Sequence, residues 1–346
     1  MYNMTNDSAV LSIDFLAGFT IFIIAFVWVI SLIPGLLIGL QAHTIDYDAV
    51  AYRTGVILVE DPGETVALNI TAPWESLPVG RVARFGLAVS RDTPNILSEE
   101  KVNRFFCTTV FNDQKYYKDK AIFGDYPYHF NISLRDGEAP PLKTGDVLPE
   151  GYGYIRRLVK IKGASNATIN ETSILSYNYK NTDQNVTSHT FSILINTPRL
   201  YTDMTDPSYR IDPVKDQIMI NITNLTSTKS NPMANVNLTS ITVKGVPYYT
   251  SIPDTSISLD GQNSTLPHNV TEQISIRFSP RFFQGVYEGI YDPALYQPIL
   301  VNLTFDLTAN STFLNNTWSS PFDYNYDPAN VTQPQLRDAV VEVAIW

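Results

Sequence analysis

The pattern of hydrophobic positions divides the chain into an apolar segment near its start and a long, more polar remainder. No charged residue lies in the run from Phe15 to Leu40, and the flanking charges are Asp14 and Asp46. About 20 apolar residues are enough for a helix to cross a bilayer core, and a helix satisfies its own backbone in lipid. The pattern therefore predicts a membrane-spanning helix that holds the protein at a membrane by its N-terminal end.

The apolar positions after this run lie on one side of a predicted helix. They recur at spacings of three and four residues and comprise Ile45, Ala49, Tyr52, Val56 and Val59. This spacing is typical of an amphipathic helix, and Asp61-Pro62-Gly63 then ends it. We expect one continuous helix over about residues 15–60, whose second half forms a stalk beyond the bilayer.

The remaining residues predict two further regions. Residues 61–162 read as mixed α/β, with a surface loop at Pro140-Pro141 and a helix that Ser98 caps. The expected elements of this region are strands at Arg81–Ser90, Tyr128–Leu134 and Tyr152–Ile161 and a helix at Glu99–Phe111.

From residue 163 to the end, short β-branched runs alternate with Pro, Gly, Asn and Asp, which favours a two-sheet β-sandwich. These runs lie near Thr190–Asn196, Gln217–Thr223, Leu238–Val243, Gln273–Phe278, Pro298–Phe305 and Ala339–Trp346. The last run predicts that the C-terminus is tied into a sheet. The expected fold class is α+β, with a leader or tail at 1–14, the helix at 15–60, a mixed region at 61–162 and a sandwich at 163–346.

The residues just before the apolar run resemble the start of archaeal type IV pilin-like proteins. The stretch is Ser8-Ala9-Val10-Leu11-Ser12-Ile13-Asp14-Phe15-Leu16. In that family a leader is cut after a small residue, and a long apolar helix follows. The resemblance implies cleavage between Ala9 and Val10. It also implies that Asp14, the fifth mature residue, meets the new N-terminal amine of a neighbouring subunit.

A longer resemblance covers roughly the first third of the chain. Its segments are Tyr52-Arg53, Glu60-Asp61-Pro62-Gly63, Trp74-Glu75, Ala83-Arg84-Phe85-Gly86-Leu87-Ala88 and Asn95-Ile96-Leu97-Ser98. Their order is similar to that of membrane-anchored pilin-like proteins of archaea, methanogens especially. This resemblance implies a class and a location, and it implies no catalytic residue.

Composition and charge argue against some classes of function. The formal net charge of −10 argues against nucleic acid as a partner. Charged residues make up 17%, below the usual quarter, and Asn, Thr, Ser and Tyr take their place, as in exported β-rich proteins. The single cysteine, Cys107, excludes an intrachain disulfide, and we expect it to be a buried, inert thiol.

Glycosylation sequons are frequent after the apolar run. The pattern Asn-x-Ser/Thr occurs at Asn69, Asn131, Asn166, Asn170, Asn185, Asn221, Asn224, Asn237, Asn263, Asn269, Asn302, Asn310, Asn315 and Asn330. Their number favours an exterior, glycan-bearing polar part. The alternative is an Asn- and Thr-rich β protein whose sequons are idle. Because few Lys or Arg flank the apolar run, the sequons decide the expected orientation.

Candidate chemistry is sparse. The sequence has no C-x-x-C, H-E-x-x-H, Walker loop or G-x-S-x-G, and its four histidines show no ligand spacing. We expect no enzyme and no cofactor, although a tethered hydrolase remains open if folding brings two carboxylates together. A weak Ca²⁺ candidate is formed by Asp323, Asn325 and Asp327, with a solvated turn as the alternative.

Aromatic residues of the second half form either a contact or glycan-binding surface or part of the core. They are Tyr248, Tyr249, Phe282, Phe283, Tyr287, Tyr291 and Tyr296.

These patterns predict a pilin-like, membrane-anchored extracellular glycoprotein. It would be a filament subunit, or an adhesion or envelope component, and its N-terminal helix would contact copies of itself or other pilin-like subunits. The alternatives are a single-span envelope or surface-layer-associated protein that never assembles, a removed signal peptide, and the tethered hydrolase. The apolar run is longer than the 7–15 residues of a signal peptide, and no basic residue precedes it.

Overall fold

The computed structural model describes most of the chain in two separate units. The described residues are 7–41, 46–66, 73–107, 109–111, 113–122, 126–170, 187–225, 231, 233–244, 256–263, 265–287, 290, 295–308 and 324–346, without the side chains of 7–14, 33–41 and 189. The first unit is Met1–Tyr47 and the second is Asp48–Trp346. Each unit is considered by itself.

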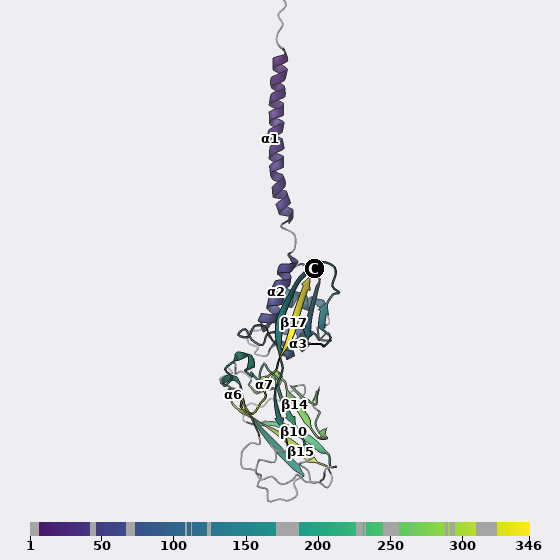
Figure 1. Ribbon diagram of the computed structural model, residues 1–346, viewed down its shortest axis with the longest axis vertical. Helices are drawn as coiled ribbons and strands as arrows, with labels where there is room; N and C mark the ends of the chain where they lie inside the picture. Colours follow the sequence, from purple (N-terminus) through teal and green to yellow (C-terminus); the bar gives the residue numbers. More distant parts are fainter. Residues whose placement is uncertain are drawn as a thin grey trace, which may run out of the picture. The chain divides into compact units, whose positions relative to one another are not determined.

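Helix α1 (Asp7–Gln41) makes up most of the described part of the first unit (Figure 1). Asp46 lies outside any helix, and a second helix, α2 (Tyr47–Glu60), begins directly after it. The prediction of one continuous helix is therefore wrong. Asp is among the residues favoured at the position before a helix, so Asp46 was an available signal for a new start.

Helix α2 ends where Asp61-Pro62-Gly63 predicted, but its buried face differs from the expected one. The buried residues are Ala51, Thr54, Gly55, Leu58 and Val59. Of the predicted apolar face, Val59 is buried and Tyr52 is exposed, while Ile45 lies outside the described residues. Small residues face inward because α2 approaches a sheet closely: a Cβ on Gly55 would lie 2.9 Å from Ile155 Cγ2.

That sheet, called sheet I here, has the strand order β3-β6-β17-β4-β5. Its strands are β3 (Ile96–Ser98), β6 (Gly153–Lys162), β17 (Leu336–Ile345), β4 (Phe130–Asp136) and β5 (Leu142–Gly145). Strand β17 pairs antiparallel with both β6 and β4, and Figure 1 shows it in yellow among earlier strands. The C-terminus is tied into a sheet as predicted, but this sheet is built mainly from residues before 163.

Other elements of this region match the sequence less well. The predicted strand at 81–90 is reduced to β2 (Val82–Arg84), which pairs with β1 (Glu64–Thr65). The predicted helix at 99–111 is α3 (Glu99–Phe105), and the Ser98 side chain makes no capping hydrogen bond. Short turns complete the region: η1 (Trp74–Ser76), η2 (Val79–Arg81), α4 (Gln114–Tyr117) and the π-helical turn Lys118–Ile122.

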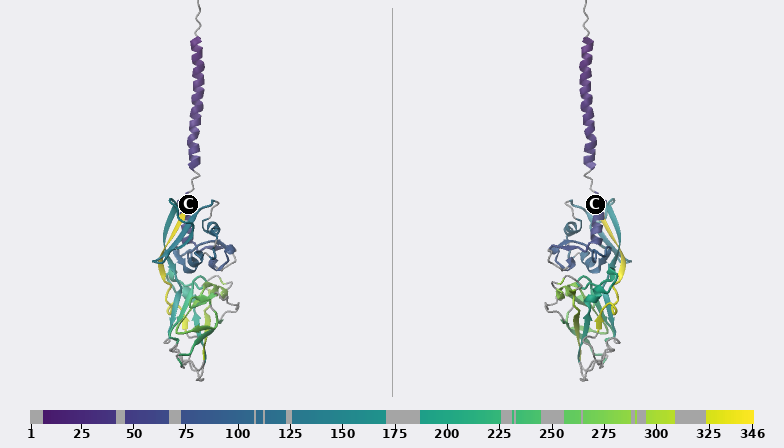
Figure 2. Two further views of the ribbon diagram at one scale, coloured as in Figure 1. Left: turned by 90° about the vertical axis from the view of Figure 1, so that its right-hand side faces the viewer. Right: turned by 90° about the vertical axis from the view of Figure 1, so that its left-hand side faces the viewer.

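Two further five-stranded sheets follow (Figure 2). Sheet II has the order β12-β11-β14-β9-β7, with β12 (Gln262–Asn263), β11 (Ile257–Leu259), β14 (Ile274–Phe278), β9 (Ile218–Ile222) and β7 (Ser165–Ile169). Sheet III has the order β13-β10-β15-β8-β16, with β13 (His268–Val270), β10 (Val236–Lys244), β15 (Ile299–Leu307), β8 (Ser188–Ile195) and β16 (Tyr324–Tyr326). All six predicted runs after residue 163 overlap observed strands.

Sheets II and III contribute side chains to one hydrophobic cluster. Ile220 and Ile276 come from sheet II, while Val301 and Leu303 come from sheet III. The short helices α6 (Thr197–Thr202), η4 (Pro207–Tyr209) and α7 (Pro280–Val286) lie along the same part of the chain. Each sheet also contains one parallel pair, β3 with β6, β7 with β9, and β16 with β8. The protein is therefore α+β, an N-terminal apolar helix followed by mixed sheets.

Candidate functional site

The apolar segment of α1 is exposed on every side. All residues from Phe15 to Leu32 lie open to the surroundings, and none is charged. The hydroxyls of Thr20 and Ser31 donate to backbone carbonyls within the helix at 2.7 Å, so they leave no free donor. The helix is long and apolar enough to cross a membrane, although a signal sequence would pass the same test.

The residues that the pilin resemblance singles out lie at the start of α1. Ala9, Val10 and Asp14 belong to the helical backbone, and their side chains lie outside the described part of the structure. Cleavage between Ala9 and Val10 and a subunit contact through Asp14 therefore stay predictions.

The sequons that the structure describes differ in exposure. Exposed asparagines are Asn170, Asn224, Asn263, Asn269 and Asn330; partly buried ones are Asn131, Asn166, Asn221 and Asn237. Asn302 is 5% exposed, and its Oδ1 accepts a hydrogen bond from Ser192 Oγ at 2.8 Å. A glycan on Asn302 has no room in the folded chain. Outside the described residues lie Asn69, Asn185, Asn310 and Asn315.

The Ca²⁺ candidate is a closed turn in its described part. Asp327 is buried, and its carboxylate accepts hydrogen bonds from Arg199 Nη1 at 2.8 Å and Asn325 Nδ2 at 2.7 Å. The same carboxylate also accepts hydrogen bonds from the Ala329 backbone N–H and the Asn330 side-chain amide, so its oxygens stabilise the turn after β16. Asp323 lies outside the described residues. Among the described residues, no group of three or more acidic, His or Cys side chains could hold a metal ion.

The remaining polar and aromatic candidates are dispersed. His129 pairs with Asp146 at 2.8 Å and His268 with Asp260 at 2.9 Å, while His43 and the His189 side chain lie outside the described part. The aromatic residues Phe282, Phe283, Tyr287 and Tyr296 are buried, so these four belong to the core. Tyr248, Tyr249 and Tyr291 are not described.

Cys107 differs from the expected buried thiol. It is only partly buried, and its Sγ lies 3.1 Å from Thr109 Oγ1. The hydrogen bond from Thr109 lowers the pKa of the Cys107 thiol.

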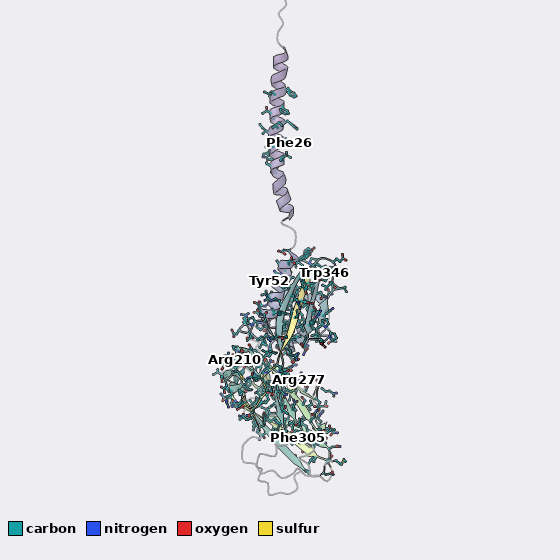
Figure 3. The ribbon with its side chains drawn as sticks, viewed as in Figure 1. Phe26, Tyr52, Arg210, Arg277, Phe305 and Trp346 are labelled. Carbon is teal, nitrogen blue, oxygen red and sulfur yellow. The ribbon has the colours of Figure 1, made fainter. Side chains whose placement is uncertain are left out.

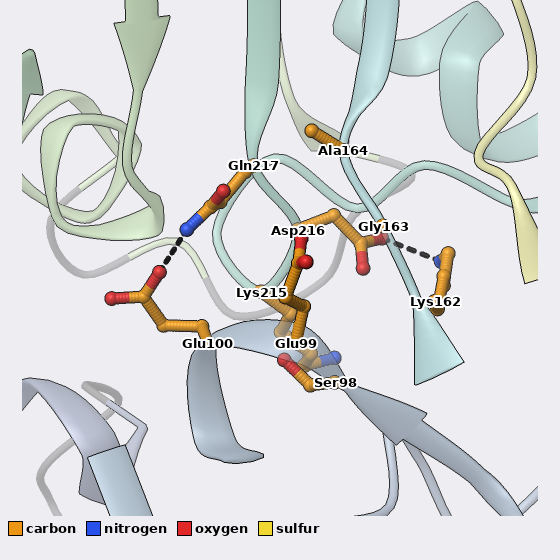
Figure 4. A pocket seen from close by; sticks show the side chains of 9 residues that line it. All are labelled: Ser98, Glu99, Glu100, Lys162, Gly163, Ala164, Lys215, Asp216 and Gln217. Carbon is orange, nitrogen blue, oxygen red and sulfur yellow. Dashed lines mark hydrogen bonds and ion pairs between the residues drawn. The ribbon is translucent and has the colours of Figure 1, made fainter. Parts of the chain in front are cut away.

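Ionisable side chains gather where sheet I meets sheet II (Figure 4). Lys162, the last residue of β6, points its Nζ at Asp216 Oδ2 (2.8 Å) and at the Arg210 carbonyl (2.6 Å). Both charged groups are almost completely buried. Asp212 lies close by: its backbone N–H donates to Asp216, and its carboxylate pairs with Lys215 at 2.8 Å. Burial raises the pKa of Asp212, against the opposing effect of Lys215.

Helix α3 adds acids to the same cluster. Glu100 accepts a hydrogen bond from Gln217 Nε2, and Glu99 pairs with Arg337 at 2.9 Å. The hollow that these residues line measures about 10 Å³, room for one water molecule at most. The carboxylates of Asp216, Glu100 and Glu99 are each held by a partner from another segment, while that of Asp212 pairs with Lys215 of its own turn. The cluster therefore joins the sheets and offers no cleft for a substrate.

A second buried pair of ionisable residues consists of Lys101 of α3 and Glu75 of η1. Lys101 Nζ donates to the carbonyls of Pro62 (2.8 Å) and Ala88 (2.7 Å), and burial lowers its pKa, against the effect of Glu75. Glu75 is buried, and neither of its carboxylate oxygens has a hydrogen-bond partner on another residue. Burial raises the pKa of Glu75, with Lys101 opposing. Both shifts favour the neutral forms.

The sequence did not predict either buried cluster. Asp212, Lys215 and Asp216 stand within five positions and look like an ordinary solvated turn. The burial of Asp212 and Asp216 depends on α3 and β6, which lie fifty or more residues earlier in the chain, while Lys215 is exposed. A pattern limited to neighbours along the chain carries no signal of such a contact.

Comparison with known proteins identifies one relative. No family model and no solved structure matches the chain. An uncharacterized protein from Archaeoglobus fulgidus is 40% identical over 168 residues, which cover 45% of this chain and 86% of that protein. The fold defines an α+β protein with one N-terminal apolar helix. The chain belongs to the same family as the uncharacterized Archaeoglobus fulgidus protein.

Proposed function

We propose that the chain is a pilin-like, membrane-anchored surface protein whose α1 lies in a bilayer and whose second unit faces the exterior. The supporting observation is the exposure of the whole segment Phe15–Leu32. Burying one large apolar side chain gains about 1.5–3 kcal/mol, so a segment of this composition is unfavourable in water. Lipid is the solvent that removes this cost without any protein partner.

The second unit carries the proposed external role. Sheets II and III, which share one hydrophobic cluster, form a sandwich that bears N-linked glycans at exposed asparagines. The role is that of a filament subunit or an adhesion or envelope component, and it needs no catalysis. Three carboxylates near α3, those of Asp216, Glu100 and Glu99, are held by Lys162, Gln217 and Arg337, which supports this view over a tethered hydrolase.

Two measurements test the proposal. Carbonate extraction should leave the protein in the membrane fraction, and protease added to intact cells should digest residues 48–346. A protein that is released into the supernatant, or that protease cannot reach, would contradict the proposed topology.

Mass spectrometry of the N-terminus separates the filament from the simple anchor. A mature chain that begins at Val10 supports the filament subunit, and a retained Met1 supports an envelope protein that does not assemble. A chain cut after the apolar segment would show that the segment is a signal peptide. For the filament, Asp14→Asn should abolish assembly and retain membrane insertion, while Asp7→Asn, a matched change in the leader, should leave assembly intact.

A further inference from the structure

Aromatic side chains gather at one end of sheet I. Trp346 follows β17, and its backbone exchanges two hydrogen bonds with His129 at 2.9 and 3.0 Å. The rings of His129 and Trp346 stack with centroids 6.1 Å apart, and the Tyr152 ring lies 6.5 Å from that of Trp346. Tyr154, the second residue of β6, contacts Tyr152 at 5.9 Å.

The loop between β5 and β6 brings exposed apolar residues to the same end. Gly145 ends β5 opposite Asn131, and Gly153 begins β6 opposite Ile345, so the loop between them lies beside Trp346. In this loop Val147 is 90% exposed and Leu148 is 44% exposed. We call this surface the aromatic end; it comprises Val147, Leu148, Tyr152, Tyr154 and Trp346.

The aromatic end is also the end at which the chain enters the second unit. The backbone N–H of Tyr154 donates to Asp48 Oδ1 at 3.3 Å, which joins the first turn of α2 to the start of β6. Figures 1 and 2 show the C-terminus beside the start of α2. Figure 3 labels Tyr52 of α2, which is also exposed, and Trp346 at this end of the unit.

The covalent chain limits the distance from this end to the apolar helix. Six residue steps separate Gln41, the last residue of α1, from Tyr47, the first of α2. Six steps of extended chain reach about 20 Å at most, whatever conformation they adopt. If α1 lies in a bilayer, as proposed above, the aromatic end is therefore the part of the second unit that the chain keeps nearest to the lipid headgroups.

The side chains of the aromatic end are of the types that favour contact with lipid headgroups. Tyr and Trp combine an apolar ring with one polar atom, and they are enriched at the headgroup level of membranes. The loop carries two acids: Asp146 is satisfied by His129 at 2.8 Å and by Gln114 at 2.7 Å, and Glu150 is exposed. We propose that the aromatic end rests on the headgroup region of the bilayer that holds α1.

A spin-label experiment tests this contact on the full chain. Cys107 is the only cysteine, so Cys107→Ser gives a background for single labels. Val147→Cys reports on the aromatic end, and Met233→Cys, before β10, is the matched control because it is also 90% exposed. Val27→Cys reports on the apolar segment. Each labelled protein is placed in liposomes of zwitterionic phospholipid, and nitroxide collisions with oxygen and with a water-soluble nickel complex are compared.

We expect the oxygen-to-nickel collision ratio at residue 147 to exceed that at residue 233 several-fold, while residue 27 shows the highest ratio. Equal ratios at 147 and 233, with residue 27 inside the bilayer, would overturn the headgroup contact and leave the membrane anchor intact. A water-exposed label at residue 27 would overturn the anchor and the contact together. Spin–spin broadening at 147 that unlabelled protein removes would show that a second copy covers the aromatic end, which also overturns the inference.

Discussion

At the scale of single residues, Gly86 has no room for a side chain, because the backbone of residues 61–63 passes close to it. A Cβ placed on Gly86 would lie 2.2 Å from the Asp61 carbonyl oxygen and 2.4 Å from the Gly63 nitrogen. Its own carbonyl accepts a hydrogen bond from the buried indole of Trp74 at 2.9 Å. The obstructing atoms are backbone atoms, which cannot rotate away as side-chain atoms can.

We therefore predict that Gly86→Ala lowers the free energy of unfolding by about 3 kcal/mol, because the extra methyl group would clash with the backbone of Asp61 and Gly63. Gly80→Ala is the matched control, since a Cβ there meets nothing within 4 Å. Urea titration of both variants, followed by tryptophan fluorescence, gives the comparison. Equal midpoints for the two variants would show that the backbone segments can separate.

Glu75 predicts a pH dependence of stability. Because burial raises its pKa in the folded chain, its contribution to stability is fully present below the unfolded pKa of about 4.3 and is lost as pH rises through the folded pKa. Glu75→Gln removes this titration. We expect the variant to gain stability relative to the wild type as pH increases above 4. Denaturation midpoints between pH 4 and pH 8 measure the difference, and a constant difference would contradict the raised pKa.

At the scale of elements, the buried pair of Lys162 and Asp216 joins β6 to the segment before β9. Lys162→Met leaves the Asp216 carboxylate buried without its cation, and breaking such a pair costs about 3–5 kcal/mol. Lys160→Met, two residues earlier on β6, disrupts only the exposed pair with Asp338. We expect a large fall in the thermal midpoint for Lys162→Met and no measurable fall for Lys160→Met. A similar fall of the thermal midpoint in both variants would show that the buried pair stabilises the fold no more than the exposed pair does.

The elements also show what sequence patterns could and could not predict. Alternation along the chain predicted β8, β9, β10, β14 and β15, because each strand has one face in a core. The face of α2 was assigned wrongly because its inner positions include Thr54 and Gly55, which a search for apolar residues omits. These small residues are inside because Ile155 of sheet I lies close to the helix, and that contact is made across a hundred positions.

At the scale of the whole molecule, the sequence predicted the class and not the strand partners. The N-terminal apolar helix and the α+β class follow from composition and periodicity, which are local properties. The position of β17 in sheet I does not follow from them. An alternation with a period of two shows which residues lie on each face of a strand, but it does not show which strands pair with it. The aromatic end was missed for the same reason, since Tyr152 and Trp346 meet only through this pairing.

The return of β17 also gives the second unit two different ends. Sheet I carries the aromatic end, and its one described sequon is Asn131, whose Nδ2 donates to the Asp146 carbonyl at 2.7 Å. The other described sequons lie in or beside sheets II and III, with Asn263 on edge strand β12 and Asn269 on edge strand β13. This distribution suits an arrangement in which glycans point away from a membrane that the aromatic end contacts.

Glycan occupancy should follow this division. We predict glycans at Asn263 and Asn269, because both are exposed on edge strands, and none at Asn302, because folded chains cannot accommodate one there. Asn131 should be unoccupied as well, since its amide is engaged next to the aromatic end. Glycopeptide mass spectrometry of protein purified from a glycosylating archaeal host measures the occupancy at each site. Occupancy at Asn302 equal to that at Asn263 would contradict the sheet III packing, and full occupancy at Asn131 would argue against close membrane contact at the aromatic end.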